Sequence, residues 1–203
     1  MTIDTIMRTA PVIPVLVLDG SVDPAELAET LVDAGLPVIE VTLRTPAALD
    51  SIRSMSAVPG AIVGAGTVLD EAQLAQALDA GARFIVSPGL TNPLALAARD
   101  TGVPFLPGVA SAGDIMRGLD LGLDRFKFFP AESSGGVPAL RALAGPFGAL
   151  RFCPTGGITP DNAADWLALE PVLCVGGSWL LKPGETDLAE VARRAREAAA
   201  LAR

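Results

Sequence analysis

Glycines recur along this chain at near-regular intervals, each between a helix-like stretch and a short apolar run. The six glycines, spaced 20 to 26 residues apart, are Gly35, Gly60, Gly81, Gly102, Gly122 and Gly148. Glycine just past a helix end is typical of the left-handed helix cap, which glycine adopts without steric cost. The runs that follow are rich in Val, Ile and Phe, as expected for strands of a parallel sheet buried on both faces. The chain is therefore predicted to be a series of strand–helix units.

Eight strands can be counted in this series. They are predicted at Val12–Val17, Val38–Leu43, Ala61–Ala65, Arg83–Ser87, Val103–Pro107, Arg125–Phe129, Arg151–Thr155 and Val172–Gly176. Eight strand–helix units predict a compact (β/α)8 TIM barrel as a single domain over residues 1–203, with short loops. Residues 1–9 are expected to form a short helix across the barrel floor. The alternative is an open doubly wound sheet, but no G-x-G-x-x-G stands at a strand–helix turn, which disfavours its dinucleotide-binding version.

The predicted helix starts repeat as well. A capping side chain stands before a proline suited to the first helical turn in Asp23-Pro24, Thr45-Pro46, Asn92-Pro93 and Thr159-Pro160. Asp70 is predicted to cap a helix that runs through Leu78.

Charge and composition exclude several functions. With 15 basic and 23 acidic side chains the net charge is −8, so no basic field exists for nucleic acid or an anionic membrane. The chain has no histidine, which excludes His-based triads and His-based zinc sites. Cys153 and Cys174 are expected to be buried thiols. The N-terminus has no signal-peptide pattern and the apolar runs are strand-length, so a cytoplasmic protein is expected.

The second predicted strand carries charges where a barrel needs apolar side chains. Alternation puts Glu40, Thr42 and Arg44 on one face and three aliphatic residues on the other. Because the aliphatic face must meet the helices, the three polar side chains are expected to point into the barrel and toward its upper rim. A carboxylate there is costly unless it is paired or hydrogen-bonded.

The sixth predicted strand repeats this anomaly. Phe126 and Phe128 suit the helix layer, so Lys127 and Phe129 are expected to point inward. Burial lowers the pKa of an amine, and only an unprotonated amine is a nucleophile, so an inward lysine suits imine chemistry. An equally good interpretation is a snorkelling lysine or a structural ion pair with Glu40. Lys182, the only other lysine, is expected on the surface.

Glycine-rich turns follow the last two strands. Thr155-Gly156-Gly157 follows the seventh strand and Gly176-Gly177-Ser178 follows the eighth. Barrels commonly bind phosphate at these two loops, where backbone N–H groups and a following helix N-terminus favour an anion. Two adjacent loops of this kind favour phosphate binding over ordinary turns. Thr67, after Gly64-Ala65-Gly66, and Pro88 end the third and fourth strands at the same rim, where small residues leave room for a ligand.

Two long motifs resemble the 2-keto-3-deoxy-6-phosphogluconate (KDPG) and 4-hydroxy-2-oxoglutarate (KHG) aldolase family. Gly35–Arg44 (GLPVIEVTLR) resembles the acid–base motif of that family, and Gly122–Gly135 (GLDRFKFFPAESSG) resembles its Schiff-base motif. Further similar segments are Gly64–Val68, Ser87–Gly89, Cys153–Ile158 and Gly176–Leu180. The resemblance covers nearly the whole chain.

The resemblance implies a role for each residue. Lys127 would form an imine with the substrate ketone, and Glu40 would move the protons. Residues implied to bind the rest of the substrate are Arg44, Thr67, Pro88, Phe129 and Thr155. Residues implied to hold its phosphate are Gly156, Gly157, Gly177 and Ser178. The products would be pyruvate and glyceraldehyde 3-phosphate, in the Entner–Doudoroff route of carbohydrate metabolism, with no metal or other cofactor. The family is typically trimeric, so a homotrimer is implied.

Three alternatives stay open on the sequence. The same chemistry could act on the phosphogalactonate epimer or on 4-hydroxy-2-oxoglutarate. A phosphosugar isomerase would need an acid–base pair and no imine-forming lysine. A non-catalytic binder of phosphorylated ligands is disfavoured, because an inward lysine is a costly element of a passive pocket.

Overall fold

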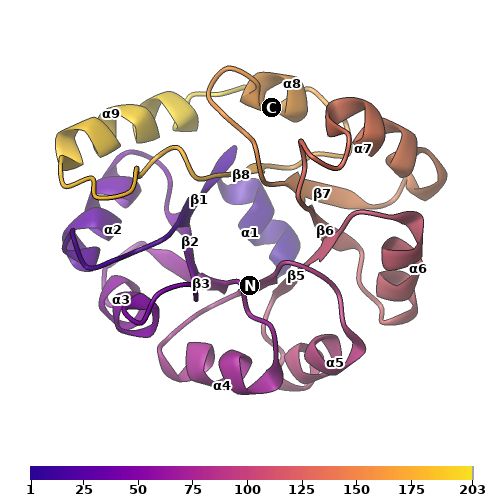
Figure 1. The fold of residues 1–203 in the computed structure, drawn as a ribbon, viewed down its shortest axis with the longest axis horizontal. Helices are drawn as coiled ribbons and strands as arrows, with labels where there is room; N and C mark the ends of the chain where they lie inside the picture. Colours follow the sequence, from indigo (N-terminus) through magenta and orange to yellow (C-terminus); the bar gives the residue numbers. More distant parts are fainter. Residues whose placement is uncertain (203) are drawn as a thin grey trace.

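The computed structural model describes residues 1–202 and shows a ring of parallel strands surrounded by helices (Figure 1). The strands are β1 (Val12–Leu16), β2 (Val38–Thr42), β3 (Ile62–Gly66), β4 (Ile85–Ser87), β5 (Phe105–Val109), β6 (Arg125–Phe128), β7 (Arg151–Pro154) and β8 (Val175–Gly177). Their order is β7-β6-β5-β4-β3-β2-β1-β8. Bridges between Phe152 and Val172 and between Thr155 and Gly176 join β7 to the β8 side and close the ring. The predicted (β/α)8 barrel is therefore confirmed.

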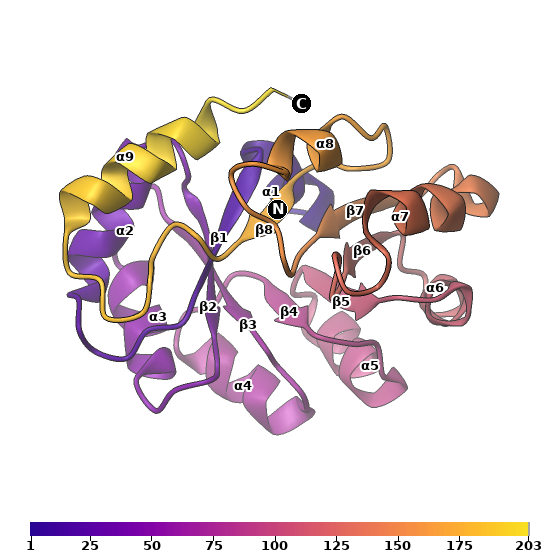
Figure 2. The ribbon, with the colours of Figure 1, turned by 45° about the horizontal axis from the view of Figure 1, so that its top comes forward.

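Helices connect consecutive strands, and one precedes the barrel (Figure 2). They are α1 (Ile3–Thr9), α2 (Pro24–Asp33), α3 (Ala48–Ser56), α4 (Glu71–Asp79), α5 (Asn92–Thr101), α6 (Ala112–Asp120), α7 (Gly136–Ala144), α8 (Ala163–Leu167) and α9 (Leu188–Ala199), with a short 3-10 helix at Gly145–Phe147. Among residues 1–202, no helix combines the length and apolar character needed to cross a membrane.

Three strand predictions are shifted. The fourth strand begins at Ile85 rather than Arg83, because its pairing with β3 begins where Ala65 lies opposite Ile85. The fifth strand begins at Phe105 rather than Val103, because its pairing with β4 begins where Ile85 lies opposite Phe105. The eighth begins at Val175 rather than Val172, because continuous pairing with β1 begins where Val12 lies opposite Val175. Val172 makes only the isolated bridge to Phe152.

The glycine repeat marks helix ends as predicted, with one exception. Positive φ angles occur at five of the six glycines, namely Gly35, Gly60, Gly81, Gly102 and Gly122. Gly148 instead has φ −57° and follows the 3-10 helix, so its predicted left-handed cap is wrong.

The helix-start predictions are correct only for the aspartates. Asp23 and Asp70 accept hydrogen bonds from the backbone of the first turn of α2 and α4. The hydroxyl of Thr45 donates a hydrogen bond to the carbonyl of Leu18 at 2.5 Å and does not cap a helix. The helix α3 begins three residues later. The other two predicted starts are also displaced: Thr91 precedes α5, and Asn162 precedes α8.

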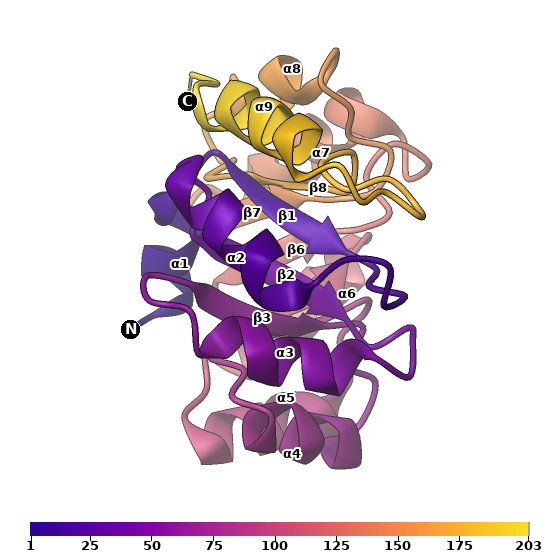
Figure 3. The ribbon, with the colours of Figure 1, turned by 90° about the vertical axis from the view of Figure 1, so that its left-hand side faces the viewer.

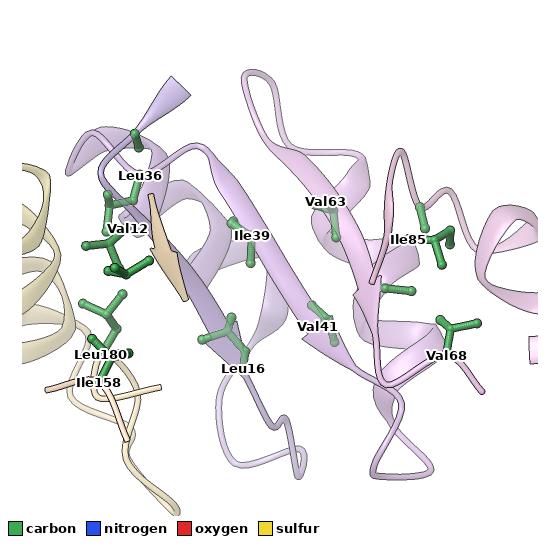
Figure 4. Packing of buried hydrophobic residues seen from close by; sticks show 14 of the residues in the cluster. Val12, Leu16, Leu36, Ile39, Val41, Val63, Val68, Ile85, Ile158 and Leu180 are labelled. Atoms are coloured by element: carbon green, nitrogen blue, oxygen red, sulfur yellow. The ribbon is translucent and has the colours of Figure 1, made fainter. Parts of the chain in front are cut away.

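The alternation of side chains divides the interior into two layers. Outward-facing residues such as Val12, Leu16, Ile39, Val41 and Val63 pack against the helices (Figure 4). They form the larger core, between the strands and the helices, where burial of apolar surface stabilises the fold.

The barrel floor is covered by α1. Figure 3 shows this helix at the end from which the strand arrows lead away. Its Ile6 and Met7 are fully buried against inward residues that include Val38, Phe84 and Leu106. Arg125 of β6 fastens the helix through a 2.6 Å ion pair with Asp4. The floor is thus apolar and packed, which leaves the carboxyl-terminal end of the strands for polar chemistry.

Candidate active site

Four inward strand positions above the floor are glycines, and each makes room for a neighbouring group. A Cβ on Gly66 would lie 2.7 Å from Cγ of Glu40, and one on Gly176 would lie 2.8 Å from Cγ2 of Thr155. A Cβ on Gly64 would overlap the ring of Phe84, and one on Gly108 would overlap the carbonyl of Pro88. The expectation that Gly64 and Gly66 leave room for a ligand is therefore wrong: the space is occupied by protein side chains.

Glu40 and Lys127 meet inside the barrel. They come from β2 and β6, which lie on opposite sides of the ring (Figure 1). Nζ of Lys127 donates to Oε1 of Glu40 at 3.0 Å and to Oε2 at 3.4 Å. The side chains are only 7% and 4% exposed, respectively. A proton can therefore pass directly between the amine and the carboxylate.

The pair is supported on two sides. The ring centroid of Phe129 lies 5.3 Å from Nζ of Lys127, within the range of a cation–π contact. Thr42, fully buried on the same strand as Glu40, donates to the carbonyl of Leu16 at 2.9 Å. That bond ties β2 to β1 beside Glu40 and limits the motion of the strand that carries the carboxylate.

Arg44 lies at the rim, beyond the end of β2. Its Nε donates to Oγ1 of Thr67 at 3.3 Å. Thr67 has φ 59°, a conformation that is uncommon for a β-branched residue. Strained backbone of this kind is often found at functional sites. Here it places the Thr67 hydroxyl next to the exposed guanidinium of Arg44. The fork of Arg44 is suited to bind a carboxylate above the Glu40–Lys127 pair.

Pro88 follows β4 at the same rim. Ser87 donates to the carbonyl of Gly89 at 2.6 Å and so closes a tight turn around Pro88. The carbonyl of Pro88 faces the bare Cα of Gly108. A backbone acceptor is thereby brought next to the site.

The turns after β7 and β8 lie side by side, joined by the bridge between Thr155 and Gly176. Gly156 and Gly157 have φ values of 98° and 80°. Within residues 1–202 the N–H groups of Gly157 and Ile158 donate to no protein atom. Successive unpaired N–H groups form a concavity suited to an anion.

The expected helix N-terminus is not part of this concavity. After β7, α8 begins only at Ala163 and is five residues long, and after β8 no helix begins before Leu188. Ser178 is exposed beside the turn, while Gly177 leaves space for the ring of Trp179. The two turns can therefore bind an anion through backbone N–H groups and the Ser178 hydroxyl, and not through the N-terminus of a helix.

Two features of the site escaped the sequence reasoning. One is Gly108, which lies in β5 and makes room for the Pro88 carbonyl. Strand alternation could have identified it, because it predicts that this glycine faces the barrel interior. Nothing in the local pattern around Glu132 signals its contacts with Gly157, in the turn after β7, or with Asn162 and Trp166, which lie 30 and 34 positions later. Within residues 1–202 no group of three or more His, Cys, Asp or Glu side chains is placed to hold a metal ion.

The sequence model of a family described as KDPG and KHG aldolase matches residues 3–194. The chain belongs to this aldolase family. A 2-dehydro-3-deoxy-phosphogluconate aldolase of Zymomonas mobilis is 56% identical over 201 residues, 99% of this chain and 97% of the relative. A KHG/KDPG aldolase of Escherichia coli is 51% identical, covering 98% of this chain and 96% of the relative.

Solved structures of aldolases agree with this assignment. The Zymomonas mobilis KDPG aldolase with 3-phosphoglycerate superimposes with a TM-score of 0.97, at 56% identity over 99% of this chain and 96% of that one. The Legionella pneumophila KDPG aldolase, with pyruvate captured as a covalent carbinolamine, has a TM-score of 0.95 at 39% identity, covering 98% of this chain and 99% of that one. The aldolase fold therefore accounts for 98–99% of this chain.

Proposed function

We propose that this protein is a class I aldolase that splits 2-dehydro-3-deoxy-6-phosphogluconate into pyruvate and D-glyceraldehyde 3-phosphate. The observation that carries the proposal is the buried contact between Nζ of Lys127 and the carboxylate of Glu40, at 3.0 Å. The names of the Zymomonas mobilis and Escherichia coli relatives support it. A phosphosugar isomerase or a passive binder would leave the buried lysine without a use.

Imine formation is the first step. Glu40 accepts a proton from Lys127, and the free amine attacks the C2 ketone to give a carbinolamine. Glu40 then returns a proton to the C2 hydroxyl, which departs as water and leaves a protonated imine. One carboxylate can serve both transfers because it lies within hydrogen-bond distance of the nitrogen.

Carbon–carbon cleavage follows. Glu40 takes the proton of the C4 hydroxyl, the C4–O bond becomes a carbonyl, and the C3–C4 electron pair moves into the imine to give an enamine. Glyceraldehyde 3-phosphate leaves. Protonation of the enamine at C3 and hydrolysis of the imine release pyruvate and restore the Lys127 amine. The ring of Phe129, 5.3 Å from Nζ, is placed to pack beside the imine and exclude water from it.

The remaining residues hold the two ends of the substrate. Arg44 and Thr67 bind the C1 carboxylate, with the turn at Pro88 lining that end. Thr155 is buried where the turn after β7 meets the turn after β8, and it contacts the middle of the substrate's carbon chain. The residues that bind the phosphate are Gly156, Gly157, Gly177 and Ser178. The 3-phosphoglycerate of the Zymomonas mobilis structure and the pyruvate adduct of the Legionella pneumophila structure support a site for each end.

Trapping with pyruvate tests the imine directly. The protein is incubated with pyruvate, reduced with borohydride and mapped by peptide mass spectrometry. An adduct on Lys127 is expected. Lys182 is the internal control, because it is exposed and is the only other lysine. No adduct, or an adduct confined to Lys182, would overturn the proposal.

A second substrate is favoured by one comparison. The Escherichia coli relative is named for both KHG and KDPG, so we propose that 4-hydroxy-2-oxoglutarate is also split, with a higher KM because it has no phosphate to bind. The phosphogalactonate epimer is distinguished by comparing kcat/KM for the two C4 epimers under the same conditions.

The family resemblance supports three further features. We propose a cytoplasmic homotrimer that needs no metal, because the protonated imine itself is the electron sink. Light scattering after size-exclusion chromatography should give three times the mass of the chain, and EDTA should leave the cleavage rate unchanged. A monomeric mass or a loss of rate in EDTA would refute the corresponding feature.

A further inference from the structure

Glu132 places a carboxylate beside the turn that we propose to bind phosphate. Its Oε1 accepts hydrogen bonds from Nε1 of Trp166 at 2.8 Å and from Nδ2 of Asn162 at 3.2 Å. Trp166 is fully buried, so its indole fixes the position of the carboxylate. Negative charge near a bound phosphate is electrostatically unfavourable. The hydrogen bonds of Glu132 must therefore favour phosphate binding by more than its charge opposes it.

The carbonyl oxygens of the neighbouring turn, Thr155–Gly157, all accept hydrogen bonds from the protein. The N–H of Ala131 donates to the carbonyl of Thr155 at 2.8 Å, and the N–H of Glu132 donates to that of Gly156 at 3.1 Å. Nδ2 of Asn162, which also contacts Glu132, donates to the carbonyl of Gly157 at 3.1 Å. With three successive carbonyls fixed by hydrogen bonds, the peptide groups of the turn are held in place, and the N–H groups of Gly157 and Ile158 are left for a ligand.

The Glu132 side chain also contacts the turn itself. A Cβ on Gly157 would lie 2.6 Å from Cγ and 2.7 Å from Cβ of Glu132. The stem of the glutamate thus packs on the bare Cα of Gly157, while its carboxylate holds the amide that binds the Gly157 carbonyl. Both contacts restrict rotation of the Gly157 peptide.

We propose that Glu132, held by Trp166 and acting through Asn162 and its own contact with Gly157, is a positioning residue that keeps the Thr155–Gly157 turn in its phosphate-binding conformation. The proposal rests on the proposed function, because it assumes that this turn binds the substrate phosphate. Glu132 touches neither the reacting carbons nor the Glu40–Lys127 pair. Its contribution is to the affinity for phosphorylated ligands and not to imine chemistry.

Kinetics of Glu132→Ala, Glu132→Gln and a control variant test this proposal. The control is Glu71→Ala, which removes an exposed glutamate at the first turn of α4. Glu132→Ala is expected to raise KM for the phosphorylated substrate about tenfold, the effect of losing charge-assisted hydrogen bonds. Inhibition by inorganic phosphate should weaken by a similar factor. Glu132→Gln keeps one acceptor oxygen and should lie between the wild type and Glu132→Ala.

Readouts that do not depend on the affinity for phosphate should stay unchanged. The kcat of Glu132→Ala and the rate at which its Lys127 is trapped by pyruvate and borohydride should stay near the wild-type values. If Glu132→Ala does not fold, Asn162→Ala decides, because it removes the donor to both Glu132 and Gly157 and should give the same selective rise in KM.

Three results would overturn the proposal. An unchanged KM in folded Glu132→Ala would show that the turn needs no such support. A lower KM in Glu132→Gln would show that the carboxylate acts only by repelling phosphate. A fall in the rate of pyruvate trapping by the same factor as the rise in KM would show that Glu132 has only a general structural role. These outcomes differ from failure of the proposed function, in which the wild type itself gives no adduct on Lys127.

Discussion

Gly66→Ala is the substitution that most directly tests how the barrel positions Glu40. Gly66 lies in β3 with no positive φ, so alanine fits the backbone. The added methyl would lie 2.7 Å from Cγ and 2.8 Å from Cδ of Glu40, closer than carbon atoms approach without strain. Glu40 must then swing away or push β2 and β3 apart.

The size of the effect follows from this overlap. Overpacking of a filled interior costs about 1–3 kcal/mol, which corresponds to a fall in melting temperature of about 2–12 °C for a domain of this size. A displacement of the Glu40 carboxylate by about 1 Å is expected to lower kcat by roughly 10²-fold. A 10²-fold loss of kcat corresponds to about 2.7 kcal/mol of activation free energy, which is similar in size to the expected loss of stability. The two effects are therefore separated by measuring kcat at a temperature where the variant is still folded.

The assay is the cleavage rate at saturating substrate, measured with the melting temperature of each variant. Gly113→Ala is the matched control, since Gly113 lies in α6 and a Cβ there meets nothing closer than 3.8 Å. It should leave kcat unchanged. A folded Gly66→Ala enzyme with wild-type kcat would refute the argument that Gly66 fixes the position of Glu40.

Three further outcomes are expected. Glu40→Gln should keep the fold and still form the pyruvate adduct slowly, while turnover falls by roughly 10²–10⁴-fold; near-normal turnover would remove the assigned role. Arg44→Lys should raise KM about tenfold with little change in kcat, because a point charge replaces a two-pronged contact; a lower kcat at unchanged KM would contradict a binding role. Asp4 has a pKa held below its usual value by its hydrogen bonds to Arg8 and Arg125. Its stabilisation is therefore present at neutral pH and is lost as pH falls through that lowered pKa. The difference in urea midpoint between wild type and Asp4→Asn should shrink from pH 7 to pH 3, and a difference that grows toward acid would show the sign to be wrong.

The orientation of the reactive side chains could be predicted from the sequence because it depends on local alternation. Glu40 and Lys127 each stand between apolar neighbours that belong to the helix-facing side. Their separation could not be predicted. They are 87 residues apart in the chain, and only closure of the barrel brings β2 and β6 to face each other across its interior.

The errors of the sequence reasoning have a shared cause. Thr45 was expected to cap a helix, but its hydroxyl meets the carbonyl of Leu18, 27 residues away. A helix N-terminus was expected beside the phosphate turn, but Ile158–Asn162 intervene before α8 begins at Ala163. In each case the residue concerned contacts a distant segment: Thr45 bonds Leu18, and Asn162, which precedes α8, bonds Glu132, 30 residues away.

By itself, the sequence determined the strand–helix repeat and the faces of the strands, including the inward direction of Lys127 and Glu40, because each depends on spacing over a few residues. The tertiary structure decided the 3.0 Å contact between Lys127 and Glu40, the space that Gly66 leaves for that acid, and the contacts of Glu132 with Trp166 and with Gly157 of the turn after β7. These depend on how the closed ring packs residues that are far apart in the chain, and no local pattern carries that information.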